Sequence, residues 1–201
     1  MLEIAPVLVI ITSDSEALKW CKKMPVSICF SDRKLYNAAY VKNCGIKWST
    51  ADTLTFLDCD RIISPNPLEK LKQGSYVTHC INDFEFGGYT TGTGGNITAW
   101  KKDCISIGGY DESFGDLYGR EDTDFEIRLQ RKGINRIITR SKFQGIEHPK
   151  HFRTKYTEAN SPEESLVLTS AKLQKNIDEN LVVANQGKEI GLGSELVQEV
   201  S

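Results

Sequence analysis

Two carboxylates stand two residues apart, directly after an apolar segment typical of a buried strand. Residues 54–57 predict that strand, and Asp58 and Asp60 follow it on either side of Cys59. Because side chains alternate along a strand, both carboxylates point to one side and Cys59 points to the other. Two like charges this close favour a bound cation, and oxygen ligands select a hard metal such as Mg²⁺ or Mn²⁺, which in turn favours a phosphate-bearing ligand. The alternative is a pair of solvated carboxylates in a frequent tripeptide.

A third carboxylate lies at the start of a well-defined predicted helix. Residues 121–132 carry acids in the first turn and bases in the last, and Gly133 follows, as the helix dipole and C-cap rules predict. Phe125 and Leu129 mark the buried stripe of this helix, and Asp122 lies three residues before Phe125 on the same face. We therefore expect Asp122 at the inward edge of a helix N-terminus, where its anion is stabilised.

Histidines and cysteines offer further candidate ligands. His148 and His151 flank Pro149 after the last predicted strand, and a nitrogen ligand beside two carboxylates suits Mn²⁺ better than Mg²⁺, although such histidines are commonly ordinary surface or core residues. His79 falls in a predicted strand and is interpreted as structural. The six cysteines contain no CxxC pair, so buried free thiols are expected and a zinc site is not.

The elements that position these side chains alternate along the first 60 residues. The strands are expected at residues 7–12, 26–30 and 54–57, and the helices at 15–23 and 35–44, with the second helix ending at Gly45. This order predicts an α/β fold with a mainly parallel sheet, helices on both faces, and ligands beyond the carboxyl ends of the strands. Polar residues follow all three strands, so Thr12, Asp32 and Asp58 are expected to meet at one edge of the sheet.

The later part of the chain divides less sharply. Strands are expected near residues 76–81, 98–100 and 134–139, and Ser161-Pro162-Glu163-Glu164 is a capping box that opens a helix to about Lys175. Beyond Asn185 no periodicity is evident. We therefore predict a catalytic domain over residues 1–155, a C-terminal helix packed on that domain within residues 156–185, and a flexible tail over residues 186–201.

Composition limits the classes of function. The chain has 201 residues, of which 39% are hydrophobic and 26% charged, as in a soluble globular domain. Its net charge of −2 excludes the basic balance of a general nucleic-acid binder, but residues 126–155 hold nine bases and two acids, which form either a solvated face or a site for a small anion. The apolar run 7–11 is too short to span a membrane and no cationic signal region precedes it, so we expect a cytoplasmic protein.

Three segments carry a resemblance to a known family. They are Asp58-Cys59-Asp60 with the following Pro65-Asn66-Pro67-Leu68, YNAAYVKNCG at residues 36–45, and GGNITAWKKDCISIGGYDESFGDLYGREDTDFEIRLQRKG at 94–133. Together they resemble metal-dependent glycosyltransferases of the GT-A fold, in particular the β-1,4-galactosyltransferases and the bacterial chondroitin polymerase modules. Residues 36–45 align without gaps to the FNRAKLLNVG type of segment in the galactosyltransferases. The resemblance covers roughly residues 6–153.

This resemblance implies a Rossmann-like GT-A fold and an inverting transfer of a sugar from a nucleoside diphosphate sugar, expected to be a UDP-sugar, to a glycan or glycoprotein hydroxyl. It implies Mn²⁺, with Mg²⁺ as the substitute, held by Asp58, Asp60 and His148. Asp122 is then the general base, while Glu121 and Tyr118 bind the acceptor. The implied donor-binding residues are Thr12, Asp32, Arg33, Asn37, Asp58, Gly94 and Gly95.

Departures from the family pattern leave alternatives open. Ala38 stands where galactosyltransferases have the arginine of FNRA, and Arg120 stands where they have the second glycine of GWGGED. A catalytically silent module that binds sugar nucleotides or glycans is therefore one alternative. Another is a haloacid-dehalogenase-like phosphatase, although Ile62 stands where those enzymes usually carry Thr or Val. A core of this size leaves little room for acceptor recognition. We therefore expect either a partner domain in a longer protein or a simple acceptor.

Overall fold

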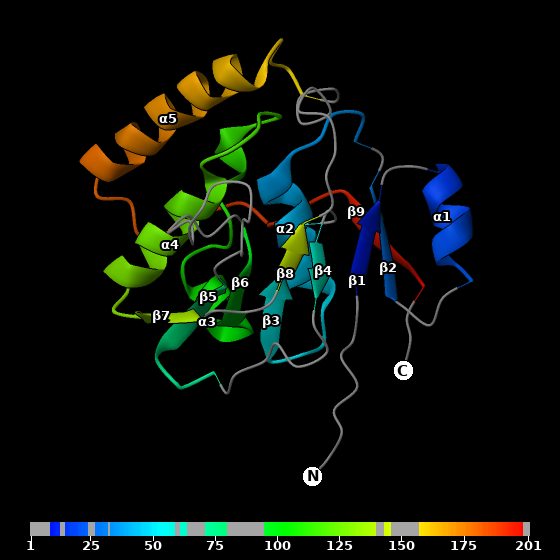
Figure 1. Cartoon of the computed structure of the whole chain (residues 1–201), viewed down its shortest axis with the longest axis horizontal. Helices are drawn as coiled ribbons and strands as arrows, with labels where there is room; N and C mark the ends of the chain where they lie inside the picture. Colours follow the sequence, from blue (N-terminus) through cyan, green and yellow to red (C-terminus); the bar gives the residue numbers. More distant parts are fainter. Residues whose placement is uncertain are drawn as a thin grey trace.

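The computed structural model describes residues 9–12, 15–23, 27–31, 33–58, 61–63, 71–79, 95–139, 143–145 and 157–198. In these ranges the strands form three small sheets, with helices packed around them (Figure 1). The strands are β1 (Val9–Thr12), β2 (Ser27–Ser31), β3 (Thr53–Phe56), β4 (Arg61–Ile63), β5 (Ser75–His79), β6 (Ile97–Trp100), β7 (Asn135–Thr139), β8 (Phe143–Gly145) and β9 (Ser194–Gln198). The helices are α1 (Ser15–Cys21), α2 (Ala38–Trp48), α3 (Lys101–Ser106), the 3-10 helix η2 (Glu112–Phe114), α4 (Glu121–Arg131) and α5 (Pro162–Asp178).

The first β–α–β unit is parallel, as predicted. β1 and β2 pair in parallel with Thr12 opposite Phe30, so the carboxyl ends of these two strands lie side by side. The segment that leads from β2 to Arg33 therefore starts beside Thr12. This edge is where the sequence placed the donor-binding residues.

The prediction of a mainly parallel central sheet is not confirmed. β3 pairs with β6 in antiparallel fashion, and the four-stranded sheet has the order β3-β6-β5-β7, in which only β5 and β7 are parallel. β4 and β8 form a separate antiparallel pair. β3 is thus hydrogen-bonded to a strand that comes forty residues later, a pairing that hydrophobic periodicity alone does not specify.

Helix α2 differs from its prediction at both ends. It begins after Asn37, whose side chain caps the first turn by accepting a hydrogen bond from the Tyr40 N–H at 2.8 Å. It then continues through Gly45 to Trp48. Cys44 and Ile46 on either side of Gly45 are fully buried, and their packing offsets the helix cost of glycine, about 1 kcal/mol.

The tail beyond residue 185 was expected to lack regular structure, and this expectation is wrong for residues 194–198. They form β9, which pairs antiparallel with β2 and is held further by a 2.8 Å hydrogen bond from Trp48 Nε1 to Ser194 Oγ. Upstream, the Gly191 N–H donates to Glu112 Oε1 at 2.8 Å. An edge strand of five residues is too short to produce a clear periodic signal.

The main core lies between the four-stranded sheet and the helices α2, α3 and α4. Its centre is three aromatic rings, with Tyr110 and Phe125 stacked at 3.9 Å between centroids and Phe56 edge-on to Tyr110 at 5.2 Å. Phe56 closes β3, two residues before Asp58, and Phe125 lies three residues after Asp122. These rings therefore fix the ends of β3 and α4 relative to each other.

Helix α5 packs on α4 largely through polar contacts. Its predicted N-cap is confirmed, because Ser161 Oγ accepts from the Glu164 N–H at 3.1 Å. Near its C-terminus, Arg131 donates to three backbone carbonyl oxygens, those of Asn176, Ile177 and Leu181. No helix within the described residues has the length and apolar character needed to cross a membrane.

Candidate active site

Glu121 and Asp122 open helix α4, where the sequence placed them. Only 9% of the Glu121 side chain and 19% of the Asp122 side chain is exposed, so both carboxylates are largely withdrawn from solvent. The first peptide N–H groups of α4 and the helix dipole favour negative charge here. The expected inward position of Asp122 is confirmed.

Gly95 brings Asp58 and Asp122 together. A Cβ atom built on Gly95 would lie 2.9 Å from Asp122 Oδ2 and 3.1 Å from each carboxylate oxygen of Asp58. Both carboxylates therefore border the Cβ position of Gly95, and a side chain at residue 95 would collide with them. Gly95 also has a φ of 81°, in the left-handed region that favours glycine.

Lys42 of α2 completes this cluster, and no role was predicted for it from the sequence. Its Nζ donates to Glu121 Oε1 at 3.1 Å and also to Asp122 Oδ1, and only 10% of its side chain is exposed. The ammonium lies 5.0 Å from the centroid of the Tyr110 ring. The only available signal was its place inside a segment that aligns to a galactosyltransferase motif. Asp58, Glu121, Asp122, Lys42 and Gly95 are hereafter the carboxylate cluster.

The electrostatics of the carboxylate cluster raise the pKa of Asp122 to about 7. Burial is the main cause, and the charges of Glu121 and Asp58 add to it, while Lys42 opposes the rise. Burial also works against a charge on Lys42, but Asp122 and Glu121 outweigh it and hold the pKa of the ammonium well above its usual value. Asp122 thus has the proton affinity of a base that works near neutral pH.

Tyr118, the predicted acceptor-binding residue, is half-buried and fixed by α5. Its backbone N–H donates to Ser165 Oγ at 2.6 Å, and Ser165 Oγ donates to the Tyr118 carbonyl at 3.1 Å. Helix α5 therefore holds the residues that lead into the carboxylate cluster. The next two residues, Gly119 and Arg120, have φ values of 99° and 70°.

These left-handed conformations explain why glycines suit this place and predict a stability difference. Gly119→Ala should lower the free energy of unfolding by about 1–2 kcal/mol, because an L-residue is strained at this φ. The added Cβ would also lie 2.8 Å from Leu166 Cδ2. Arg120→Gly relieves the same strain at the neighbouring residue and should not lower stability by more than about 0.5 kcal/mol. Urea unfolding measures both.

A further variant separates strain from steric overlap at Gly119. The double variant Gly119→Ala/Leu166→Ala removes the overlapping methyl group but leaves the backbone strain. We expect the alanine at residue 119 to cost less free energy of unfolding in the Leu166→Ala background, where only the backbone strain remains, but still about 1 kcal/mol. A Gly119→Ala protein as stable as the parent would show that the loop does not require the left-handed conformation.

Four predicted site residues, Asp32, Asp60, Gly94 and His148, lie outside the described residues, and Thr12 is described only as part of β1. No group of three or more His, Cys, Asp or Glu side chains among the described residues has the arrangement of a metal site, and two of the three predicted ligands are outside that set. The described ligand does fit a hard cation, since Asp58 turns both oxygens toward the space that Gly95 leaves open.

Arg33 and Asn37, predicted to bind the donor, make internal contacts. Arg33 Nη2 pairs with Asp116 Oδ1 at 2.7 Å, and its guanidinium lies over the Tyr40 ring. Asn37 is buried and caps α2, as described above, while its Nδ2 donates to the Glu112 carbonyl at 3.4 Å. Both residues connect the segment after β2 to the loop before α4, and donor binding by either remains a prediction.

His79 has the structural role that its strand position predicted. It is buried, its ring nitrogens bond to Thr98 Oγ1 at 2.7 Å and Thr139 Oγ1 at 3.2 Å, and burial lowers its pKa to about 4. The four described cysteines, Cys21, Cys29, Cys44 and Cys104, are free and buried, as expected.

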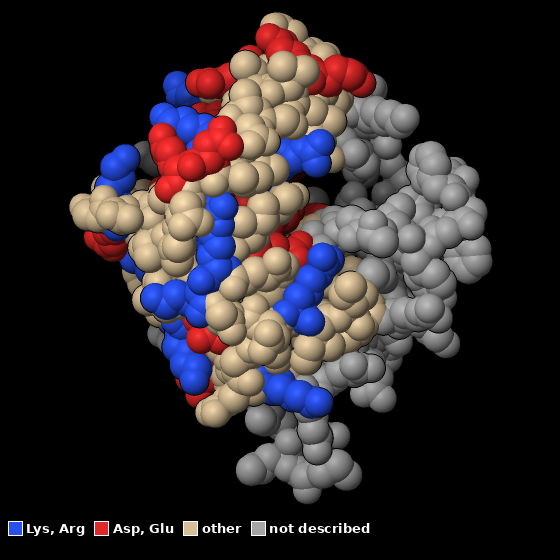
Figure 2. Space-filling view, turned by 90° about the vertical axis from the view of Figure 1, so that its left-hand side faces the viewer, with Lys and Arg blue, Asp and Glu red and all other residues tan. Residues whose placement is uncertain are grey.

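The arginines in the described first part of the basic window, residues 126–139, make internal contacts and do not form the anion-binding surface that was considered. Arg128 is fully buried against Asp124, Arg131 binds the end of α5, and Arg136 pairs with Glu126 at 3.2 Å. Figure 2 shows acidic and basic side chains interspersed over the face that carries α4 and α5. These arginines are therefore structural, and the remainder of the window, from residue 140, is described only at 143–145.

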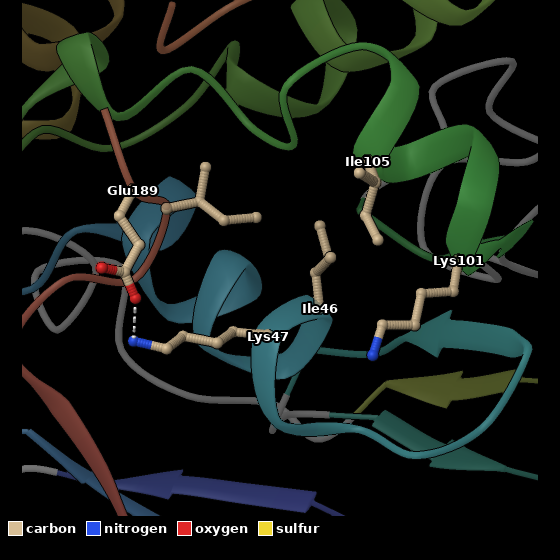
Figure 3. A pocket seen from close by; sticks show the side chains of 6 residues that line it. Ile46, Lys47, Lys101, Ile105 and Glu189 are labelled. Atoms are coloured by element: carbon tan, nitrogen blue, oxygen red, sulfur yellow. Dashed lines mark ion pairs between the residues drawn. The ribbon is translucent and has the colours of Figure 1, made fainter. Parts of the chain in front are cut away.

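A surface pocket of about 280 Å³ lies elsewhere, between α2, α3 and the segment before β9 (Figure 3). Three isoleucines form its apolar wall and Lys101 and the Lys47–Glu189 ion pair form its rim. None of its lining residues belongs to the carboxylate cluster. The pocket therefore does not mark the candidate active site.

Comparison with known proteins places the fold. A family model described as the N-terminal domain of galactosyltransferase matches residues 78–155, a range that includes Gly95, Tyr118, Glu121 and Asp122. The catalytic domain of Drosophila β1,4-galactosyltransferase 7 in complex with xylobiose is similar in structure, with a TM-score of 0.55 and 16% identity over 81% of this chain and 78% of that chain.

A mutant of the same Drosophila enzyme, in complex with manganese, UDP-Gal and xylobiose, is equally similar. Its TM-score is 0.55 at 16% identity, over 78% of this chain and 77% of that chain. No curated protein sequence gives a significant match. The resemblance inferred from the motifs is confirmed: residues 78–155 match a galactosyltransferase family model, and the fold of the chain is similar to that of a galactosyltransferase catalytic domain.

Proposed function

We propose that this protein is a metal-dependent, inverting glycosyltransferase that moves a sugar from a UDP-sugar to a hydroxyl group of a glycan or glycoconjugate. The observation that carries the proposal is the convergence of Asp58 and Asp122 on the space beside Gly95. Asp58 is suited to hold the metal ion that binds the donor diphosphate, and Asp122 is suited to accept the proton of the acceptor hydroxyl. The similar Drosophila structure holds manganese, UDP-Gal and xylobiose, which supports a reaction of this class.

Asp122 is the proposed general base. A carboxylate with a pKa near 7 is partly ionised at neutral pH and accepts the proton of the attacking hydroxyl, which contributes about 10²- to 10⁴-fold in rate. On the Gly95 side its Oδ2 lies 2.9 Å from the position that a Cβ atom at residue 95 would take, so the glycine leaves room beside this oxygen. A single base opposite the leaving diphosphate produces inversion at the anomeric carbon.

Asp58, together with Asp60 and His148, is proposed to hold the metal. A divalent cation in this place acts as a Lewis acid that stabilises the negative charge of the departing diphosphate. Asp58 directs both of its oxygens to the space that a larger residue than Gly95 would close. Mn²⁺ fits the mixed oxygen and nitrogen ligands, and Mg²⁺ is the proposed substitute.

The acceptor is proposed to lie against Tyr118 and Glu121. Glu121 Oε1 accepts a hydrogen bond from Lys42, and Oε2 is proposed to bind an acceptor hydroxyl. Ser165 holds the backbone at Tyr118, so the aromatic side chain extends from a fixed position. This arrangement places acceptor recognition next to the base.

Calorimetric titration of nucleotide sugars with and without Mn²⁺ tests the proposal. We expect one UDP-sugar to bind only with the metal, and Asp60→Ala to abolish that binding, because a ligand to the cation is lost. Asp52→Ala is the matched control, since Asp52 is an exposed aspartate just before β3 and should leave binding unchanged. Mn²⁺-dependent binding of normal strength to Asp60→Ala would contradict the metal assignment.

The alternatives give different products. A silent binding module would bind a nucleotide sugar without hydrolysing or transferring it, and a phosphatase would release inorganic phosphate through an aspartyl-phosphate. The structural similarity is to galactosyltransferases, so the fold gives no support to the phosphatase alternative. Ala38, the departure that favoured a silent module, is buried in the first turn of α2 and leaves the carboxylate cluster intact.

A further inference from the structure

The two oxygens of Asp122 have different surroundings. Oδ1 accepts the hydrogen bond from Lys42 Nζ, whereas Oδ2 is the atom nearest to the Cβ position of Gly95, which both oxygens of Asp58 also border. A carboxylate that rotates freely about its terminal bond would exchange these oxygens. Lys42 restricts the orientation of the carboxylate because it binds Oδ1 and, at the same time, Glu121 Oε1.

We propose that Lys42 is a positioning residue that holds Asp122 Oδ1 and so presents Oδ2 to the acceptor hydroxyl. The inference rests on the proposed function. In the transfer, the acceptor proton moves to Oδ2, and the acceptor oxygen forms its bond to the anomeric carbon. The bond from that carbon to the diphosphate oxygen breaks, with its electron pair staying on the diphosphate. Lys42 keeps its proton throughout.

The surroundings of Lys42 suit this role. The Lys42 side chain is nine-tenths buried, so its hydrogen bonds to two carboxylates are little weakened by water. It approaches the face of Tyr110, which stacks on Phe125 of α4, so the same core that fixes α4 also fixes the lysine. Asp58, Glu121 and Asp122 lie close together and repel one another. The positive charge of Lys42 lowers this repulsion.

Lys42 is a departure from the galactosyltransferase segment to which residues 36–45 align. In the gap-free alignment of residues 36–45 to FNRAKLLNVG, Lys42 stands where the galactosyltransferase segment has leucine. An apolar residue at this place offers no hydrogen bond to the base. The interaction is therefore not part of the pattern that first identified the fold.

The test compares transfer and donor binding in Lys42→Met and Lys42→Arg. Methionine keeps the length and packing of the side chain but not its charge, and we expect kcat to fall about 10²-fold, the effect of a misplaced catalytic group. Mn²⁺-dependent binding of the UDP-sugar, measured by calorimetry, should stay within about threefold, and the KM of the acceptor should change less than kcat. Lys42→Arg keeps the positive charge and can donate to both carboxylates. Its kcat should be at least tenfold higher than that of Lys42→Met.

Chemical rescue separates positioning from a merely structural role. Lys42→Ala leaves a space the size of the lost side chain, and ethylammonium should restore transfer in a saturable manner, while ethanol should not. Lys47→Ala is the matched control, since Lys47 is on the same helix and its ion pair with Glu189 lies away from the carboxylate cluster. It should transfer like the parent protein.

Three results would overturn the inference. They are Lys42→Met with the kcat of the parent, a loss of transfer in Lys42→Met that Lys42→Arg does not recover, and a Lys42→Ala protein that binds the donor but is not rescued by ethylammonium. Transfer by the parent protein is measured first. Its absence would contradict the proposed function itself, whereas normal transfer with an unaffected Lys42→Met contradicts only the role of Lys42.

Discussion

Asp122→Asn is expected to lower kcat for sugar transfer by about 10²- to 10⁴-fold while leaving Mn²⁺-dependent donor binding unchanged. Asparagine has the shape of aspartate, and its amide oxygen still accepts a hydrogen bond from Lys42. It does not accept the proton of the acceptor hydroxyl. Steady-state kinetics with saturating donor and calorimetry of donor binding measure the two effects separately.

Glu163→Gln is the matched control, because Glu163 is also an acid in the first turn of a helix but is exposed on α5. It should transfer at the parent rate. If Asp122→Asn also did so, the assignment of the base would be wrong. If Asp122→Asn lost donor binding as well, Asp122 would belong to the donor site instead.

The same residue predicts a pH dependence. Burial, aided by the charge of Glu121, raises the pKa of Asp122 to about 7, so the ionised base becomes more abundant as the pH rises through this value. The rate should therefore increase with pH along one limb, which disappears in Asp122→Asn. A cation bound at Asp58 stabilises the neighbouring carboxylate and moves the limb below pH 7.

Arg128→Met is expected to lower the free energy of unfolding by about 3–5 kcal/mol, the usual cost of removing one partner from a buried ion pair. Arg128 Nε donates to Asp124 Oδ2 at 2.7 Å, and Nη1 donates to the carbonyl oxygens of Ile107 and Gly109 at 2.8 and 2.7 Å. Its loss leaves Asp124 charged and buried, with Asn176 as its remaining hydrogen-bond donor. Urea unfolding followed by circular dichroism measures the change.

Two further proteins show whether the uncompensated charge is the cause. Arg128→Met/Asp124→Leu removes both charges and should recover part of the lost stability. Lys132→Met, at an exposed position one turn later, should change stability by no more than about 0.5 kcal/mol. An Arg128→Met protein of parental stability would show that the buried ion pair does not stabilise the fold.

The sequence was most informative where a local pattern decides the structure. The acids and bases of α4, with Phe125 and Leu129 on its inner stripe, were sufficient to place Asp122 at a buried edge, and the structure confirms this. The capping box at Ser161 likewise predicted the start of α5. In both cases the decisive interactions join residues within one helical turn.

It was least informative where contacts join distant segments. Lys42 meets Glu121 across almost eighty residues, and β3 pairs with β6 across more than forty, so neither pattern could be read locally. The charge of Arg128 suggested a surface cation, but Arg128 lies on the inward face of α4 and is fully buried. Composition reports which charges are present, and only the packing shows which of them reach solvent.

The most direct test of the central claim is the product of the reaction. The protein is incubated with Mn²⁺, the UDP-sugar that binds and a panel of simple glycosides, and proton NMR follows the anomeric signal. We predict release of UDP and a new glycoside whose anomeric configuration is inverted relative to the donor. A product of retained configuration, release of inorganic phosphate from the donor, or a bound donor that is neither transferred nor hydrolysed would contradict the account.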